Sequence, residues 1–168
     1  MAFVMLVPNK ISAFGVTIDR VYNVDFDVGG PRSSGLRSDV QLVQSLLKFR
    51  FANGRHNVRS LKTGRILTDL NVDGIYGPAT ADAISSYQHY IWAKPGGHQL
   101  MLPDGIVSRA NPTGVSTISK TGYTIVYLNI HLKLSTGGEL DPLFMFPDEP
   151  LRSDLKRSLE AQGLAAAA

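Results

Sequence analysis

The run DGIYGPAT at residues 73–80 constrains the fold more than any other part of this sequence. Gly74 and Gly77 open backbone conformations that residues with a Cβ avoid, and Asp73 can accept hydrogen bonds from nearby amides. Pro78 suits the first turn of a helix, where its missing N–H would have no partner in any case. The run therefore predicts a tight structural corner that leads into a helix. The residues expected to build it are Asp73, Gly74, Gly77, Pro78 and Thr80.

Two helices are predicted, one before this corner and one after it. Residues 38–51 place apolar side chains on two helical stripes, so this helix should be covered on two sides, and Ser38 or Asp39 should cap its start. The second helix should begin after Pro78 and end at the Pro-Gly-Gly turn of residues 95–97. The stripes comprise Val40, Val43, Leu47 and Phe51 with Leu42, Leu46 and Phe49 in the first helix, and Thr80, Ala83, Ile84, Tyr87 and Ile91 in the second.

Strand patterns occur towards both ends of the chain. Residues 16–28 alternate between apolar and polar side chains, with Tyr22, Val24, Phe26 and Val28 on the face expected to be buried. Residues 123–134 alternate in the same way and give the strongest strand signal in the chain. Elsewhere we predict a short hairpin around residues 62–64, a helical turn at 104–110, and an amphipathic helix at 151–163. Its apolar side comprises Leu151, Leu155 and Leu159, and Gly163 should cap it.

Three motifs occur in a fixed order through the middle of the chain. DVQLVQSLL at residues 39–47 precedes the corner, AISSYQ at 83–88 follows it, and DGIV at 104–107 echoes its first residues. Together they resemble the peptidoglycan-binding-like family and its D-G-x-x-G-P-x-T signature, over residues 37–109. After the second element, which includes Asp104 and Gly105, the sequence has SRAN where the signature has Gly-Pro-x-Thr. The resemblance implies a small three-helix fold that holds a hydrolase or a particle against the bacterial wall.

These patterns predict an α+β fold. It would consist of a small three-helix peptidoglycan-binding-like module with an antiparallel β extension built from the N- and C-terminal segments. Residues 1–36 should form the N-terminal β extension and residues 37–117 the helical module. Residues 118–168 should form a C-terminal strand and a short helix that pack with the N-terminal extension.

The residue types needed for catalysis do not occur in catalytic patterns. The chain has no cysteine, which excludes thiolate metal ligands and disulfides. No HExxH pair and no GxSxG elbow occurs, and Asp25 and Asp27 are expected to be solubilising groups on a strand. We therefore predict a protein that is not an enzyme and has no metal site or cofactor. None of the four histidines stands in a paired spacing typical of metal ligands; they are His56, His89, His98 and His131.

Aromatic and basic side chains are the best candidates for ligand contact. Tyr76, Tyr90 and Trp92 offer faces on which sugar rings can stack. Residues 40–68 contain six basic residues and no acidic one, and this stretch either meets an anionic partner or is a solvated surface. In the first case its side chains would meet peptide-stem carboxylates or wall phosphates. Nucleic acid is not favoured, because aromatic residues are scarce in the stretch. The basic candidates are Arg55, Arg59 and Lys62.

The sequence favours a non-catalytic module that binds the glycan or the peptide stem of bacterial peptidoglycan. One alternative is a structural component of a phage tail or a contractile injection or secretion particle, in which strand edges mediate self-assembly or bind protein partners. Another is an accessory or inhibitor of a wall hydrolase. No apolar run is long enough to span a membrane, and the N-terminus lacks the basic region of a signal peptide. We expect a cytoplasmic or particle-associated protein that reaches the envelope, if at all, by a non-classical route.

Overall fold

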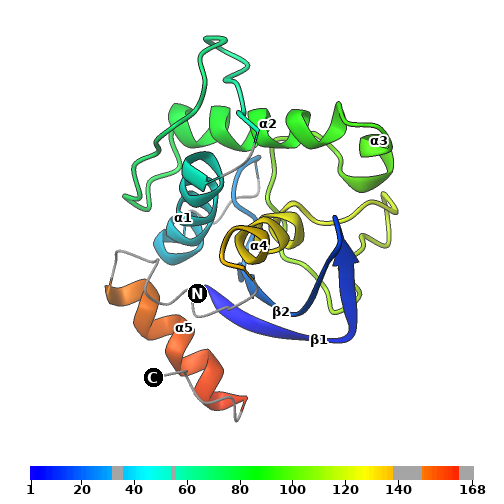
Figure 1. Cartoon of the computed structure of the whole chain (residues 1–168). Coiled ribbons are helices and arrows are strands. Elements are labelled where there is room, and N and C mark those ends of the chain that lie inside the picture. Colours follow the sequence, from blue (N-terminus) through cyan, green and yellow to red (C-terminus); the bar gives the residue numbers. More distant parts are fainter. Residues whose placement is uncertain (32–35, 54–55, 138–148, 163–168) are drawn as a thin grey trace.

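The computed structural model describes residues 1–31, 36–53, 56–137 and 149–162 (Figure 1). Helices and a small antiparallel sheet occur together, which confirms the predicted α+β class. In Figure 1, α2 lies across one side of the molecule, with α1 and α4 beneath it. The elements are β1 (Phe3–Ala13), β2 (Val16–Asn23), α1 (Arg37–Asn53), α2 (Pro78–Trp92), α3 (Gly97–Leu100), α4 (Thr124–Ser135) and α5 (Glu149–Ala161).

The sheet is a single hairpin of β1 and β2. Ala13 pairs with Val16 across a turn in which Phe14 and Gly15 both have positive φ, 52° and 77°. Two such residues make the tight turn that matches the twist of a hairpin. The strand predicted from residue 16 is therefore present, although β2 ends at Asn23 and Phe26 beyond it is 50% exposed rather than buried. The pairing strand β1 was not predicted.

Helices α1 and α2 lie where the apolar stripes place them. The stripe residues of both helices are buried, except Phe49, which is partly buried against the core. The predicted N-cap of α1 is wrong, because the helix already begins at Arg37. Asp39 lies inside it, 1% exposed, and accepts hydrogen bonds from the backbone amides of Asp25 and Phe26 at 3.2 and 3.1 Å. Its carboxylate thus accepts hydrogen bonds from backbone amides of the segment after β2 rather than from amides at the start of its own helix.

The strand predicted over residues 123–134 is wrong: this segment is helix α4. Every side chain from Thr124 to Ile130 is buried, so the helical repeat of apolar residues is hidden there and chance alternation dominates the pattern. Asn129 and His131, which suggested a solvent-exposed strand face, are instead buried or partly buried partners of other groups. The predicted β extension from both chain ends is therefore also wrong among the described residues, since only N-terminal residues form the sheet.

Two smaller expectations for the loops have opposite outcomes. The hairpin around residues 62–64 is confirmed by a bridge between Arg59 and Ile66 and by a 2.8 Å hydrogen bond from the Ser60 amide to the Arg65 carbonyl. The helical turn expected at residues 104–110 is wrong. This segment is extended enough at Val107 to pair with Val28 through two backbone hydrogen bonds, of 3.0 and 2.9 Å.

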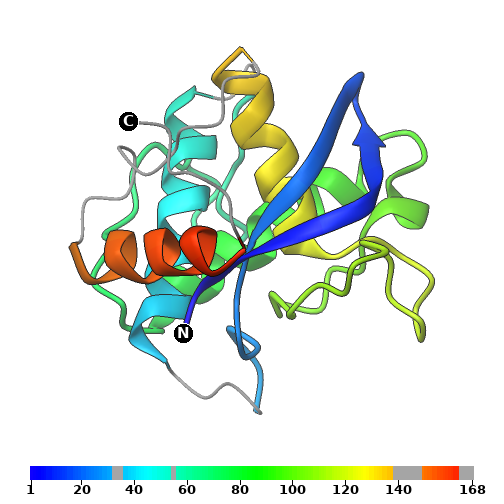
Figure 2. The same ribbon diagram turned by 90° about the horizontal axis from the view of Figure 1, so that it is seen from below.

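Helix α5 covers the start of β1, as Figure 2 shows from below. Its predicted apolar side is confirmed, with Leu151, Leu155 and Leu159 all buried. Ser158 also accepts a hydrogen bond from the Val4 amide at 3.0 Å, so the outer edge of β1 is occupied at this point. The expected cap at Gly163 lies outside the described residues.

Two asparagine side chains join the hairpin to the helices. Asn129 of α4 accepts from the Tyr22 amide at 2.8 Å and donates to the Tyr22 carbonyl at 3.0 Å. Asn23 makes the same pair of bonds with the backbone of Ala110, at 2.9 and 3.0 Å. These amides take the place of a neighbouring strand along β2, so the hairpin is fixed against α4 and the loop before it.

Candidate functional site

The corner that precedes α2 is held by one glutamine side chain from α1. Gln44 Nε2 donates to the Asp73 carboxylate at 2.9 Å and to the Thr80 hydroxyl at 3.0 Å. The same nitrogen lies 3.2 Å from the Ile75 carbonyl, while Oε1 accepts from the Gly74 amide at 2.8 Å. A single buried amide therefore binds both ends of the corner and the start of the next helix.

The corner that precedes α4 repeats this network. Gln88 Nε2 of α2 donates to the Asp104 carboxylate at 3.2 Å and to the Thr124 hydroxyl at 2.9 Å. It also donates to the Ile106 carbonyl at 2.9 Å, and its Oε1 accepts from the Gly105 amide at 2.7 Å. Each partner has the same role as in the first corner, so the chain contains two equivalent helix–corner–helix units that share α2.

The glycines of the two corners differ in backbone conformation and in the space available for a Cβ. Gly74 and Gly105 have φ of 74° and 76°, in the left-handed region that favours glycine. A Cβ at Gly74 would also lie 2.4 Å from Cγ of Arg37, whereas at Gly105 the nearest atom is 3.4 Å away. Gly77 has φ of −126°, which any residue can adopt, so the expectation that this position requires glycine is wrong.

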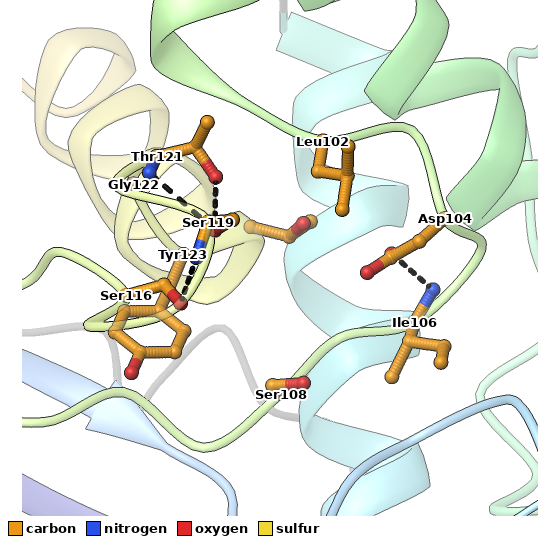
Figure 3. Close-up of a pocket in the computed structure, with 10 residues that line it drawn as sticks. Leu102, Asp104, Ile106, Ser108, Ser116, Ser119, Thr121, Gly122 and Tyr123 are labelled. Carbon is orange, nitrogen blue, oxygen red and sulfur yellow. Dashed lines mark hydrogen bonds between the residues drawn. The ribbon is translucent and has the colours of Figure 1, made fainter.

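A cavity lies beside each corner, but one is too small for a wall ligand and the other is lined by carboxylates. Figure 3 shows the smaller one, with Asp104 and Ile106 on one side and Ser119 and Thr121 on the other. Its volume of about 70 Å³ holds water rather than a sugar. The cavity at the first corner has about 420 Å³, and its lining includes the carboxylates of Asp69 and Asp73, which would repel anionic groups.

A third cavity, of about 450 Å³, has the opposite charge. We call it the Arg50 cavity. It lies where the end of α1, the end of α2, α4 and the tip of the β1–β2 hairpin meet. No carboxylate is among the described residues that line it, namely Phe14, Arg50, Asn53, His56, Tyr90, Lys94, His131, Leu134 and Ser135.

Arg50 is the central charged group of this cavity. Its side chain is only 3% exposed, and both terminal nitrogens donate to one acceptor, the His56 carbonyl, at 3.2 Å. Nε is buried and has no hydrogen-bond partner among the described residues. The guanidinium carbon lies 5.0 Å from the centre of the Tyr90 ring, and Lys94 Nζ lies 4.4 Å from the same centre. One aromatic ring thus contacts two cations.

The wall opposite Arg50 contains a neutral histidine. Burial, together with the charges of Arg50 and Lys94, lowers the pKa of His131 to about 3. Burial raises the pKa of the Tyr87 hydroxyl well above its ordinary value, so this hydroxyl keeps its proton, and it shares a 2.7 Å hydrogen bond with His131 Nδ1. Phe14 stacks on the imidazole, with ring centres 5.5 Å apart.

The aromatic residues expected to bind a ligand are not brought together. Tyr90 lines the Arg50 cavity. Trp92 is 36% exposed and packs edge-on against His98, with ring centres 4.0 Å apart. Tyr76 lies partly buried before the start of α2, about 20 Å along the helix from Tyr90. Tyr87 is fully buried, as expected for a core residue.

The basic candidates lie on another part of the surface. Arg59 and Lys62 belong to the short hairpin, which docks on the middle of α2 through Asp82 and Ser86. Both side chains are exposed, and Arg59 donates to the nearby Gly64 carbonyl. Arg55 lies outside the described residues. Sequence reasoning missed Arg50, Lys94, His131 and Phe14 as one site, although the lack of acidic residues from 40 to 68 was a partial signal.

Within the ranges described, no three His, Asp or Glu side chains are placed to hold a metal ion together. None of the helices in those ranges combines the length and apolar character needed to cross a membrane. Comparison with protein-family models, with curated proteins and with solved structures found no match.

Proposed function

We propose that this chain is a non-catalytic module that binds bacterial peptidoglycan. The observation that carries the proposal is the repeated network of Gln44 and Gln88 with the two Asp-Gly-Ile corners. Two helix–corner–helix units in series, α1 to α2 and α2 to α4, fit the small three-helix fold that the resemblance implies. In this proposal α4 is the third helix.

The second corner supports the proposal in a way that the sequence motif does not. The signature has a threonine shortly after its Asp-Gly element, but SRAN follows Asp104 and Gly105 here. Thr124, at the start of α4, makes the hydrogen bond to Gln88 that Thr80 makes to Gln44. We infer that the loop between Val107 and Thr124 is an insertion that separates the two halves of an otherwise complete second corner.

The Arg50 cavity is the surface best suited to a wall ligand. Peptide stems carry carboxylates, which Arg50 and Lys94 can attract, and the rings of Tyr90 and Phe14 offer apolar contact. The basic hairpin with Arg59 and Lys62 is a separate, exposed surface and is expected to contribute only screened attraction.

The particle alternative has lost one of the features that favoured it. An exposed strand edge at residues 123–134 would have supported it, and this segment is helix α4. The outer edge of β1 is partly occupied by Ser158 of α5. Assembly into a particle therefore enters as an outcome of the test rather than as a second proposal, and no observation favours a hydrolase inhibitor.

Co-sedimentation with purified insoluble peptidoglycan tests the proposal. We expect the chain to pellet at low salt and to remain bound at moderate salt, because a desolvated contact is screened less than a surface charge. Lys94→Met should weaken binding, and Lys62→Met is the matched control that removes an exposed lysine elsewhere. Absence of pelleting at low salt would overturn the proposal and turn attention to assembly with protein partners.

A further inference from the structure

The Arg50 side chain presents a buried charge that the described protein does not neutralise. Its terminal nitrogens share one carbonyl, that of His56, and Nε has no partner. No carboxylate of the described residues makes an ion pair with it. A guanidinium has five N–H donors, and burying its charge without a counter-ion is strongly unfavourable. An anion at this position would remove the penalty.

A second cation lies on the same aromatic ring. Lys94 Nζ and the Arg50 guanidinium both lie within 5.0 Å of the centre of Tyr90. Stacking on the ring offsets part of the cost of each charge, but it does not relieve the repulsion between them. An anion between the two groups would attract both.

The third wall supplies a donor without adding charge. His131 lines the cavity, and its Nδ1 shares a hydrogen bond with the Tyr87 hydroxyl; in the tautomer in which that hydroxyl donates, Nε2–H is the second donor of the ring. A neutral donor of this kind can bond an oxyanion at ordinary pH without titrating.

A residue with a strained backbone also lines the cavity. Phe14 has φ of 52°, which a bulky residue adopts only at a cost, and its side chain is 42% exposed. The ring nevertheless lies over His131 and within 6.0 Å of Tyr127, at the tip of the hairpin. The strain places an apolar surface beside the two cations, where it would contact the carbon part of a bound molecule.

We propose that the Arg50 cavity binds the oxyanion group, carboxylate or phosphate, of a small organic anion, with Arg50 and Lys94 as its cationic ligands and Tyr90 and Phe14 as apolar walls. The volume of about 450 Å³ suits a molecule the size of a capped amino acid. This inference concerns the same cavity that is proposed to take the wall ligand, and it names the chemical class of that ligand. The two claims are tested separately, because a free anion would occupy the cavity whether or not the chain binds peptidoglycan.

Titration followed by amide NMR shifts tests the site on the full chain. The probes are N-acetyl-alanine, its uncharged amide, and inorganic phosphate. We expect N-acetyl-alanine to shift signals at the ends of α1 and α2 and in α4, and the amide to leave them unchanged. Inorganic phosphate that displaces N-acetyl-alanine and binds more tightly would identify a phosphate source; weaker phosphate binding would identify a carboxylate source.

Matched variants complete the test. Lys94→Met should weaken N-acetyl-alanine binding about tenfold, the effect of one lost charge-assisted contact. Lys62→Met should leave it unchanged, and Arg50→Met should abolish it. If Arg50→Met does not fold, the comparison of Lys94→Met with Lys62→Met still decides. Equal binding of the amide, equal losses in the two lysine variants, or no shift with either anion would overturn the proposal.

Discussion

Gln44 and Gln88 are equivalent residues: each side-chain amide binds an aspartate, a glycine amide, an isoleucine carbonyl and the threonine of the following helix. Both amides are almost completely buried. A buried amide with every group satisfied fixes the relative position of the elements that it joins. The two residues therefore set how α1, α2 and α4 are arranged, and with them the walls of the Arg50 cavity.

This equivalence predicts similar losses of stability. Gln44→Ala and Gln88→Ala should each lower the free energy of unfolding by about 2–4 kcal/mol, because each leaves several buried polar groups unpaired. Gln99→Ala, which removes an exposed glutamine, is the matched control and should have little effect. Urea unfolding of the three variants provides the measurement. A large loss for one buried glutamine with none for the other would contradict the equivalence.

The two corner glycines should differ. Gly74→Ala and Gly105→Ala both force a Cβ into the left-handed region, at about 1–2 kcal/mol each. Gly74→Ala should be the more destabilising, because its Cβ would meet Arg37 Cγ at 2.4 Å while Gly105 has space. Thermal unfolding compares the two, and a larger loss for Gly105→Ala would contradict the packing around the first corner.

Asn129 should govern the attachment of the hairpin. Asn129→Ala removes the side chain that bonds both the amide and the carbonyl of Tyr22 in the core, so we expect a loss of about 2–4 kcal/mol and faster hydrogen exchange at the Tyr22 amide. Asn53→Ala removes an exposed asparagine that bonds only the Phe49 carbonyl, and it should change neither quantity. Unchanged exchange at Tyr22 in the Asn129 variant would show that the hairpin is held by other contacts.

His131 should make stability depend on pH. Its pKa is about 3 in the folded chain and 6.5 in the unfolded chain, so between these values the unfolded chain binds more protons. The stabilisation is therefore complete above pH 6.5 and is lost as the pH falls towards 3, by up to about 5 kcal/mol.

His131→Asn isolates this effect, because its side-chain oxygen can still accept from Tyr87 but does not titrate in this range. The difference in unfolding free energy between the wild type and this variant should shrink from pH 7 to pH 4. Carboxylates titrate equally in both chains and cancel. A constant difference would mean that folding does not lower the pKa of His131.

The parts of the fold that the sequence predicts are those with an uninterrupted pattern. Helices α1 and α2 each bury a stripe at helical spacing, and α5 has one apolar side. Helix α4 was mistaken for a strand because it is buried on almost all sides, and its polar residue Asn129 serves the backbone of Tyr22 rather than solvent. A local sequence pattern cannot identify a hydrogen-bond partner that is as distant in the sequence as Tyr22 is from Asn129.

The candidate site was less predictable for a similar reason. Arg50 was visible as one member of a basic stretch, and Tyr90 as an aromatic residue off the helical stripe. Phe14 and His131 join them only because the hairpin tip and α4 meet over the end of α1. The equivalent roles of Gln44 and Gln88 were hard to predict from the sequence, because the two residues precede their Asp-Gly-Ile runs by different numbers of residues.

The most direct test of the central claim is co-sedimentation with insoluble peptidoglycan. It compares two variants of the cavity, Arg50→Met and Lys94→Met, with two variants of the exposed hairpin, Arg59→Met and Lys62→Met. Circular dichroism confirms that each variant is folded before binding is compared. We predict that the wild type and the Arg59 and Lys62 variants pellet at moderate salt, while the Arg50 and Lys94 variants stay in the supernatant. A wild type that remains soluble, or pelleting that disappears only in the Arg59 and Lys62 variants, would contradict the account.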